Sequence, residues 1–129
     1  MTIQFQVSAL IPARPELVYN AWLNSEGHAM MTGSPAQASA VVGGEFQAWD
    51  GYINGKNLEL EAGKRILQSW RTSEFQPADP DSLLEIVLEP APTGTRVILR
   101  HSNLPPHGEQ YEQGWIDNYF LPMQEYFGS

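Results

Sequence analysis

Three histidines are the residues of this sequence with the most versatile chemistry, and their spacing argues against a metal site. His28, His101 and His107 lie far apart along the chain and show no spacing typical of metal ligands. The chain has no cysteine, which excludes a thiol nucleophile, a thiolate metal site and a disulfide framework. It also has no Gly-x-Ser-x-Gly sequence, phosphate-binding loop or dinucleotide fingerprint. The residues therefore favour a binding protein over an enzyme, and we expect no catalytic residue, no metal and no cofactor.

His101 and Gln68 alternate with apolar residues in predicted strands, so we expect both side chains to point inward. A buried imidazole or amide without a hydrogen-bond partner costs about 1–3 kcal/mol. One interpretation is that each bonds to a backbone carbonyl, to Tyr119 or to a trapped water. The other is that they orient a ligand in an otherwise apolar pocket. A cyclase or dehydratase with His101 as general base beside Asp50 or Glu45 is a third interpretation, which the spacing does not support.

Large aromatic and sulfur-containing side chains would either fill the core or form the walls of such a pocket. Met30 and Met31 lie in a short predicted helix, where they would form an adaptable lid or plug the core, because methionine fills irregular space. Both interpretations stay open from the sequence. The residues that we expect to line a ligand cavity are Trp22, Met30, Phe46, Gln68, Trp70, Leu99, His101, Trp115, Tyr119 and Met123.

Composition and charge narrow the class of protein. The 129 residues are 42% apolar and 11% aromatic, which is enough to fill a core, and we expect one domain over residues 1–129. Seven basic residues stand against fifteen acidic ones, and a net charge of −8 repels phosphate backbones and anionic lipid headgroups, so we expect no nucleic-acid partner. No apolar run approaches the ~20 residues that span a bilayer, and the first residues lack a signal-peptide pattern. We therefore expect a cytoplasmic protein without a membrane span.

The first part of the chain predicts one strand and two short helices. Residues 2–8 alternate between apolar and polar, which is the period of a half-buried strand. Pro15 suits the first turn of a helix that carries an apolar stripe. Asn24 can cap a second, short helix that continues through Met31, and Gly33 can close it.

The remainder predicts antiparallel strands followed by one long helix. Asp50-Gly51 indicates a tight hairpin turn, and we interpret Asn54-Gly55 as a bulge or bend in the next strand. Apolar residues spaced about four apart predict a helix over about residues 107–127, within which Gly114 indicates a close packing contact. The other expected strand segments are 45–49, 58–61, 65–71, 83–89 and 95–102. This order is typical of an α+β fold, with helices on one face of an antiparallel sheet.

Strand alternation also assigns residues to the two faces of the sheet. Folding the last predicted hairpin places Glu89 opposite Arg96 and Glu85 opposite Arg100, and we expect Arg65 to come beside Glu89. These charges would form a solvated outer surface or a docking face for a protein partner. The inward residues of the last three strands are Ile66, Gln68, Trp70, Leu84, Ile86, Leu88, Val97, Leu99 and His101.

Six groups of residues follow one another in a familiar order over essentially the whole chain. They are Pro15–Trp22, Gly44–Phe46, Asp50–Gly55, Lys64–Arg71, the set Thr95, His101 and Leu104-Pro105, and the set Gly114-Trp115, Tyr119 and Pro122-Met123. Together they resemble the domain shared by bacterial homologues of the activator of the heat-shock protein 90 ATPase, within the START-like (SRPBCC) superfamily. The resemblance implies a helix-grip fold: a curved antiparallel sheet of about seven strands around a long C-terminal helix, two short helices after the first strand, and an apolar cavity between sheet and helix.

The resemblance and the residues leave two classes of function, with an enzyme that uses the same cavity as a third. The first is binding of a small apolar or amphipathic ligand in the cavity. The second, implied by the family name, is a chaperone-linked interaction module of the stress response. A ligand-binding domain predicts an open cavity with one or two convergent polar groups. An interaction module predicts a filled core and a patterned outer face, and for either function we expect a monomer or a weak homodimer.

Overall fold

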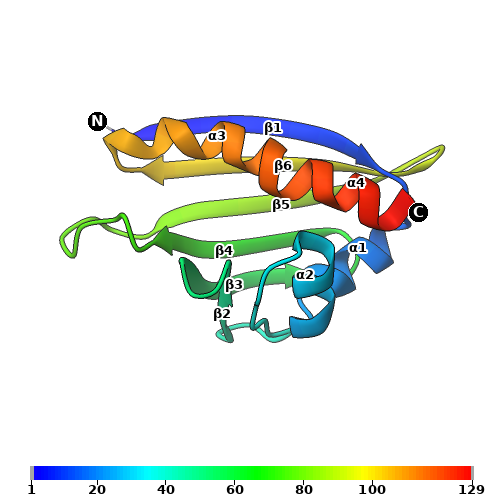
Figure 1. Ribbon diagram of the computed structural model, residues 1–129, viewed down its shortest axis with the longest axis horizontal. Coiled ribbons are helices and arrows are strands. Elements are labelled where there is room, and N and C mark those ends of the chain that lie inside the picture. The colour runs from blue at the N-terminus through cyan, green and yellow to red at the C-terminus, as the bar shows by residue number, and fades with distance from the viewer. Residues whose placement is uncertain (1, 129) are drawn as a thin grey trace.

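The computed structural model describes residues 2–128 and has the α+β order of elements expected from the sequence (Figure 1). Two of its shorter segments, η1 and η2, are a 3₁₀ turn and a π-helical turn within the C-terminal helical region. The elements are β1 (Ile3–Ile11), α1 (Pro15–Trp22), α2 (Ser25–Thr32), β2 (Glu45–Ala48), β3 (Ile53–Glu61), β4 (Arg65–Thr72), β5 (Ser82–Ala91), β6 (Gly94–Leu104), η1 (Pro106–Glu109), α3 (Gln110–Trp115), η2 (Ile116–Phe120) and α4 (Leu121–Gly128).

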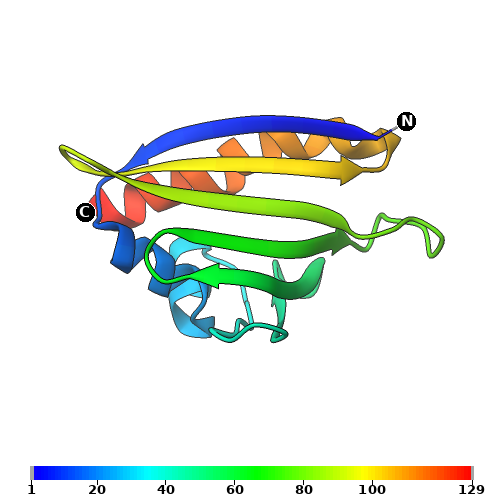
Figure 2. The ribbon, with the colours of Figure 1, turned by 180° about the vertical axis from the view of Figure 1, so that it is seen from behind.

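One curved antiparallel sheet forms the body of the structure, with strand order β1-β6-β5-β4-β3-β2. The helices cover one face of the sheet, and Figure 2 shows the opposite face uncovered. The expected strand number of about seven is wrong: residues 2–128 form six strands. Residues 33–44 run between α2 and β2 and contribute only an isolated bridge between Gln37 and Gln47. Gly33 and Gly43 have φ angles of +81° and +84° there, which interrupt an extended strand.

The short helices begin and end where the sequence predicts. Pro15 opens α1. The Asn24 side chain accepts a hydrogen bond from the backbone N–H of Gly27 at 2.8 Å, and Gly33 ends α2 in the left-handed conformation. None of the helices among residues 2–128 is long and apolar enough to cross a membrane.

The β2–β3 hairpin confirms one predicted turn and corrects another. Ala48 pairs with Ile53, so the turn lies at Trp49 to Tyr52 around Asp50-Gly51. Asn54-Gly55 is not a bulge, because both residues keep regular pairing with β2 and β4. The register shifts farther along β3, between Asn57 and Glu59.

Close packing explains the glycine at position 55 better than a bend does. A Cβ atom on Gly55 would overlap the carbonyl oxygen of Ser69 and lie 2.8 Å from the ring of Phe46. The aromatic ring therefore covers the glycine directly, and the strand stays regular beneath it. Gly114 shows the opposite case, because a Cβ there would meet only the Asn118 amide nitrogen, at 3.8 Å. The close contact expected at Gly114 is absent.

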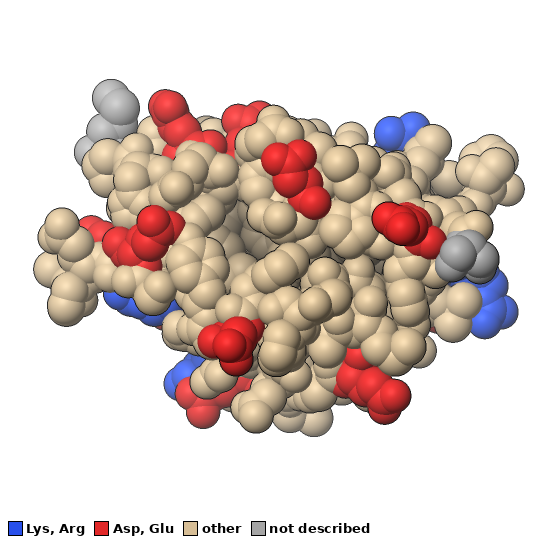
Figure 3. All heavy atoms as spheres, in the orientation of Figure 1, with Lys and Arg blue, Asp and Glu red and all other residues tan. Residues whose placement is uncertain are grey.

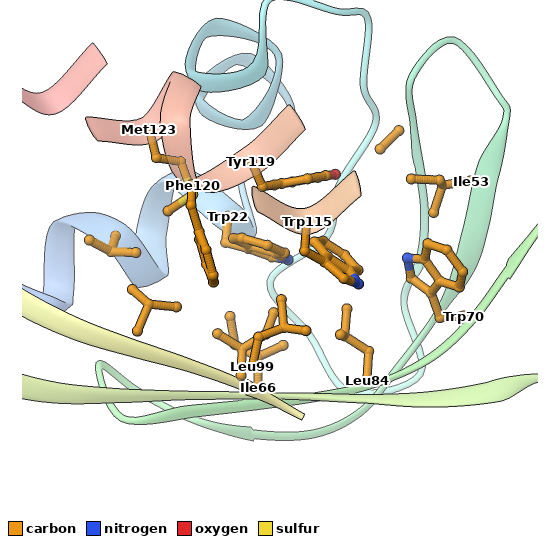
Figure 4. Packing of buried hydrophobic residues seen from close by; sticks show 14 of the residues in the cluster. Trp22, Ile53, Ile66, Trp70, Leu84, Leu99, Trp115, Tyr119, Phe120 and Met123 are labelled. Atoms are coloured by element: carbon orange, nitrogen blue, oxygen red, sulfur yellow. The ribbon is translucent and has the colours of Figure 1, made fainter. Parts of the chain in front are cut away.

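The core lies between the inner face of the sheet and the C-terminal helical region (Figure 4). All nine residues assigned inward on the last three strands are buried. The ring planes of Trp115 and Tyr119 lie within 27° and 28° of that of Trp22, so aromatic stacking joins α1 to the C-terminal region.

The outer face of the sheet carries the expected charges, with one change of partner. Glu85 lies opposite Arg100 and Glu89 opposite Arg96, as predicted. Arg65 lies opposite Val87 and not beside Glu89. Its guanidinium contacts the Glu85 carboxylate at 2.7 Å, and Glu85 also contacts Arg100 at 3.1 Å. These bonds hold the pKa of Glu85 below its usual value.

The C-terminal helical region changes geometry at η2. Pro122 has no N–H to donate to the carbonyl of Asn118, so a regular α-helix cannot pass through this point. The π-helical turn immediately precedes this proline. It carries Asn118, Tyr119 and the buried Phe120.

A buried histidine joins this helical region to the sheet. The indole N–H of Trp115 donates to Nδ1 of His101 at 3.0 Å, so this ring nitrogen must be unprotonated. Nε2–H then donates to the Ser82 hydroxyl at 2.9 Å, and that hydroxyl donates to the backbone carbonyl of Trp70 at 2.6 Å. Burial lowers the pKa of His101 to about 3, so the imidazole is neutral in the folded protein.

Acid should weaken the fold because of this histidine. In the unfolded chain the pKa of His101 returns to about 6.5, so between about pH 6.5 and 3 the unfolded state binds a proton that the folded state does not. Stability is therefore full above about pH 6.5 and falls as the pH drops. His101 alone should lower the free energy of unfolding by about 2 kcal/mol at pH 5.

Urea unfolding at a series of pH values measures this dependence. The His101→Gln variant should be less stable at neutral pH but less sensitive to acid, and an unchanged slope would contradict the assignment.

The two glycines form a matched pair for a second test. Gly55→Ala should lower the free energy of unfolding by about 1–3 kcal/mol, because Phe46 and the β4 backbone must move. Gly114→Ala should raise it by about 0.5–1 kcal/mol, because alanine favours the helix and meets no obstacle. Urea unfolding of both variants measures these changes. Equal changes in the free energy of unfolding would contradict the packing explanation.

Candidate functional site

A pocket of about 370 Å³ opens between the C-terminal helical region and the β2–β3 hairpin. The face of the molecule that carries the helix is hollowed near its centre (Figure 3). The pocket is mainly aromatic, and its lining residues include Asn118 and three tyrosines. Its lining residues are Trp49, Tyr52, Ile53, Trp70, Tyr111, Gly114, Trp115, Asn118 and Tyr119.

Three of the ten residues expected to line a cavity do line this pocket: Trp70, Trp115 and Tyr119. Six others are buried side chains that take no part in its lining, namely Trp22, Phe46, Gln68, Leu99, His101 and Met123. Met30 takes no part in this lining either, and its side chain is 56% exposed on α2. Met31 is the methionine that turns inward, and it is 1% exposed in the core. A single residue step along a helix rotates a side chain by about 100°, which separates these two environments.

Six aromatic rings form the walls of the pocket and come from separate parts of the chain. Trp49 and Tyr52 belong to the hairpin, Trp70 to β4, and the remainder to the C-terminal helical region. The ring of Trp70 meets that of Tyr111 at 78°, with centroids 4.9 Å apart. The ring planes of Trp70 and Trp115 meet at 45°.

His28 was considered only as a metal ligand from the sequence, but it is buried and fixes one wall of the pocket from behind. Its Nδ1 lies 2.9 Å from the backbone carbonyl of Trp22, which can only accept, so Nδ1 carries the proton. Nε2 therefore accepts from the hydroxyl of Tyr119, at 2.8 Å. Burial lowers the pKa of His28 and raises the pKa of Tyr119. Both groups are thus neutral, and the hydrogen bond holds the Tyr119 ring in place.

A second polar group lies at the rim of the pocket. The Tyr111 hydroxyl bonds to the Thr72 hydroxyl at 2.6 Å, and the Tyr52 hydroxyl donates to the Glu74 carboxylate. The Glu74 carboxylate also accepts from Gln110, at 3.5 Å. Burial and the bond to Glu74 raise the pKa of Tyr52. The two tyrosines therefore remain neutral and present hydroxyl groups beside a negative charge.

Gln68 has a partner deep in the structure and not in the pocket. Its amide N–H donates to the side-chain oxygen of Asn57 at 2.9 Å, and Asn57 in turn donates to the backbone carbonyls of Ser39 and Val41. This network attaches residues 39–41 to β3 and β4. The side-chain oxygen of Gln68 has no protein partner. The position suits a trapped water better than a contact with a ligand in the pocket.

The two buried histidines are held by hydrogen bonds within the protein. Both ring nitrogens of His28 and of His101 are engaged by protein groups. Neither histidine therefore presents a free base to the pocket. Among residues 2–128, no group of three or more His, Asp or Glu side chains is placed to hold a metal ion.

Comparison with known proteins places the chain among relatives of a chaperone activator. Activator of 90 kDa heat shock protein ATPase homolog 2 from Mus musculus is 29% identical over 104 residues, which cover 81% of this chain and 31% of the relative. Homolog 1 from Homo sapiens is 27% identical over 115 residues, which cover 88% of this chain and 34% of the relative. The chain therefore spans about a third of the length of these curated relatives.

Solved structures share the fold. An HSP90 activator from Plasmodium falciparum superposes with a TM-score of 0.87 at 22% identity, covering 98% of this chain and 96% of that one. An AHSA1-like protein from Aeromonas hydrophila superposes with a TM-score of 0.66 at 22% identity, covering 96% and 91%. A family model described as "Activator of Hsp90 ATPase homolog 1-like protein" matches residues 12–128. The chain belongs to this family, as the order of its sequence motifs predicts.

Proposed function

We propose that this chain binds a small apolar or amphipathic molecule in the pocket between the C-terminal helical region and the β2–β3 hairpin. The observation that carries the proposal is that about 370 Å³ stays open although the core beneath is filled. Pockets that hold small ligands usually have volumes of about 300–1,000 Å³.

The types of residue that line the pocket also support this proposal. Six aromatic residues offer apolar surface, while the Asn118 amide offers hydrogen bonds for orientation. The rings of Trp115 and Tyr119 are held from behind by His101 and His28, so these walls exist before a ligand arrives. A preformed site avoids part of the entropy cost of ordering side chains on binding.

Gly114→Leu is the variant that tests the pocket directly. The glycine lines the pocket, and a Cβ there has open space apart from the Asn118 amide. A leucine side chain should therefore occupy the pocket without disturbing the core. We expect its affinity for the neutral dye N-phenyl-1-naphthylamine to fall at least about ten-fold, a loss of about 1.4 kcal/mol. Dye fluorescence in a titration measures this.

Gln113→Leu is the matched control, because it adds the same side chain at the neighbouring exposed position. It removes only a surface hydrogen bond from Gln113 to Asp117. Dye affinity should be unchanged in this variant. Equal affinity in the wild type and in Gly114→Leu would overturn the proposal that this pocket is the binding site.

We propose, as a second candidate function, that the chain acts on a chaperone of the heat-shock protein 90 class. The observation in its favour is family membership, together with relatives that are named as activators of that ATPase. The uncovered outer face of the sheet, with its ordered Arg65, Glu85 and Arg100 network, is the surface suited to such a partner. Arg96 on the same face is exposed and takes part in none of the ion pairs that residues 2–128 form.

The ATPase rate of the heat-shock protein 90 of the same organism, measured with and without this chain, tests the second candidate. Stimulation should be saturable, and Arg96→Ala should weaken it by about three-fold or more, because the variant removes an exposed charge without breaking an ion pair. Gly114→Leu should leave the stimulation unchanged, since it alters only the pocket. An ATPase rate that does not respond to the chain would reject this function.

A further inference from the structure

The pocket has the composition of an aromatic cage with a negative rim, and this bears on the class of ligand. Aromatic faces carry partial negative charge, so a cation enclosed by several rings is attracted to each of them. Trp49, Tyr52, Trp70, Tyr111, Trp115 and Tyr119 surround this space, and no basic residue contributes to its lining.

The orientation of the rings fits a compact, rounded group. The ring planes of Trp115 and Tyr119 meet at 49°, and those of Trp49 and Tyr119 at 68°. The rings come from the β2–β3 hairpin, β4 and the C-terminal helical region, so aromatic residues line several sides of the pocket. A flat ligand would require a parallel slot instead. A substituted ammonium group is compact, positively charged and apolar at its surface, which matches such an enclosure.

Glu74 adds a negative charge that is hydrogen-bonded to the lining residue Tyr52. Its carboxylate accepts the hydrogen bond from Tyr52, a lining residue, and it is exposed to solvent. None of the ion pairs formed by residues 2–128 includes Glu74. Its other side-chain partner is the neutral amide of Gln110. The charge is therefore available to a ligand, and a hydrogen-bonded tyrosine connects it to the cage.

The distribution of charge over the molecule acts in the same direction. The net charge is −8, and acidic side chains are distributed around the hollow in Figure 3, whereas basic ones lie at the edges of that face. Arg65 and Arg100 are paired on the outer face of the sheet, away from the pocket. A field of this sign raises the local concentration of cations at the opening and repels anions.

We propose that the ligand of this pocket is an amphipathic cation, an amine or quaternary ammonium whose charged group is enclosed by the aromatic rings and faces Glu74. This inference rests on the proposed binding function and narrows its ligand class.

Two probes of the same shape separate the cation preference from simple apolar binding. Phenyltrimethylammonium and tert-butylbenzene differ only in a charged nitrogen in place of a quaternary carbon. We expect the cation to bind at least about ten-fold more tightly, as measured by quenching of tryptophan fluorescence in low salt. Gly114→Leu should abolish binding of both. If tert-butylbenzene binds equally well or better and Gly114→Leu blocks it, the cation proposal is overturned while the binding function stands. If neither probe binds, the cation proposal is overturned, and the dye titration of the wild type and Gly114→Leu decides separately whether the binding function stands.

Glu74→Gln tests the rim carboxylate with a change of one atom. It should lower the affinity for phenyltrimethylammonium by about three-fold and leave the affinity for tert-butylbenzene unchanged. Added salt should likewise reduce the preference of the wild type for the cation. Glu89→Gln removes the same charge from the outer face and serves as the control. If the two variants have the same effect on the cation, Glu74 has no specific role in binding.

Discussion

The hydrogen bond from the Trp115 indole to the neutral imidazole of His101 is the constraint on which the functional part of the structure depends. It connects the C-terminal helical region to β6 and, through Ser82, to the backbone of β4. An imidazole that gained a proton would lose its acceptor at Nδ1, so this connection requires the neutral ring that burial enforces. The bond fixes the ring of Trp115, which belongs both to the core and to the wall of the pocket. Four residues later, Tyr119 is held in an analogous way by His28 of α2.

The two histidines therefore act as structural supports, and the pocket owes its shape to groups that do not line it. Trp70, Trp115 and Tyr119 belong both to the filled core and to the lining of the pocket. Two features of the helical region keep the upper side open: Gly114 has no side chain, and the π-helical turn places both Asn118 and Tyr119 at the lining. π-Helical turns occur often at functional sites because they alter which side chains share a face. The structure thus combines the open cavity expected of a ligand-binding domain with the patterned outer face expected of an interaction module.

Local patterns in the sequence predicted the fold well and the site only in part. Alternation correctly assigned nine inward residues of β4, β5 and β6, because one buried face enforces a period of two. The register of the β5–β6 hairpin was predictable because its turn is short, whereas Arg65 was misplaced because β4 and β5 are joined by a loop whose path the sequence does not specify. Trp49, Tyr52 and Tyr111 were missed as lining residues, since only the tertiary arrangement brings the hairpin over the helix. Burial of Gln68 and His101 was predictable, but not that neighbouring side chains, Asn57, Ser82 and Trp115, satisfy most of their hydrogen-bonding groups.

The wall of the pocket formed by Trp49 and Tyr52 lies at the edge of the sheet, and this position affects how fast a bound molecule leaves. β2 is four residues long and pairs regularly only with β3. On its other side a single bridge joins Gln47 to Gln37, so the hairpin that carries Trp49 and Tyr52 is weakly anchored there. Edge hairpins of this kind open locally at a lower free-energy cost than central strands. A molecule enclosed in the pocket could therefore leave through movement of the hairpin while β4, β5 and β6 stay paired. Its residence time would be set by this local opening, independently of the global unfolding rate of the protein.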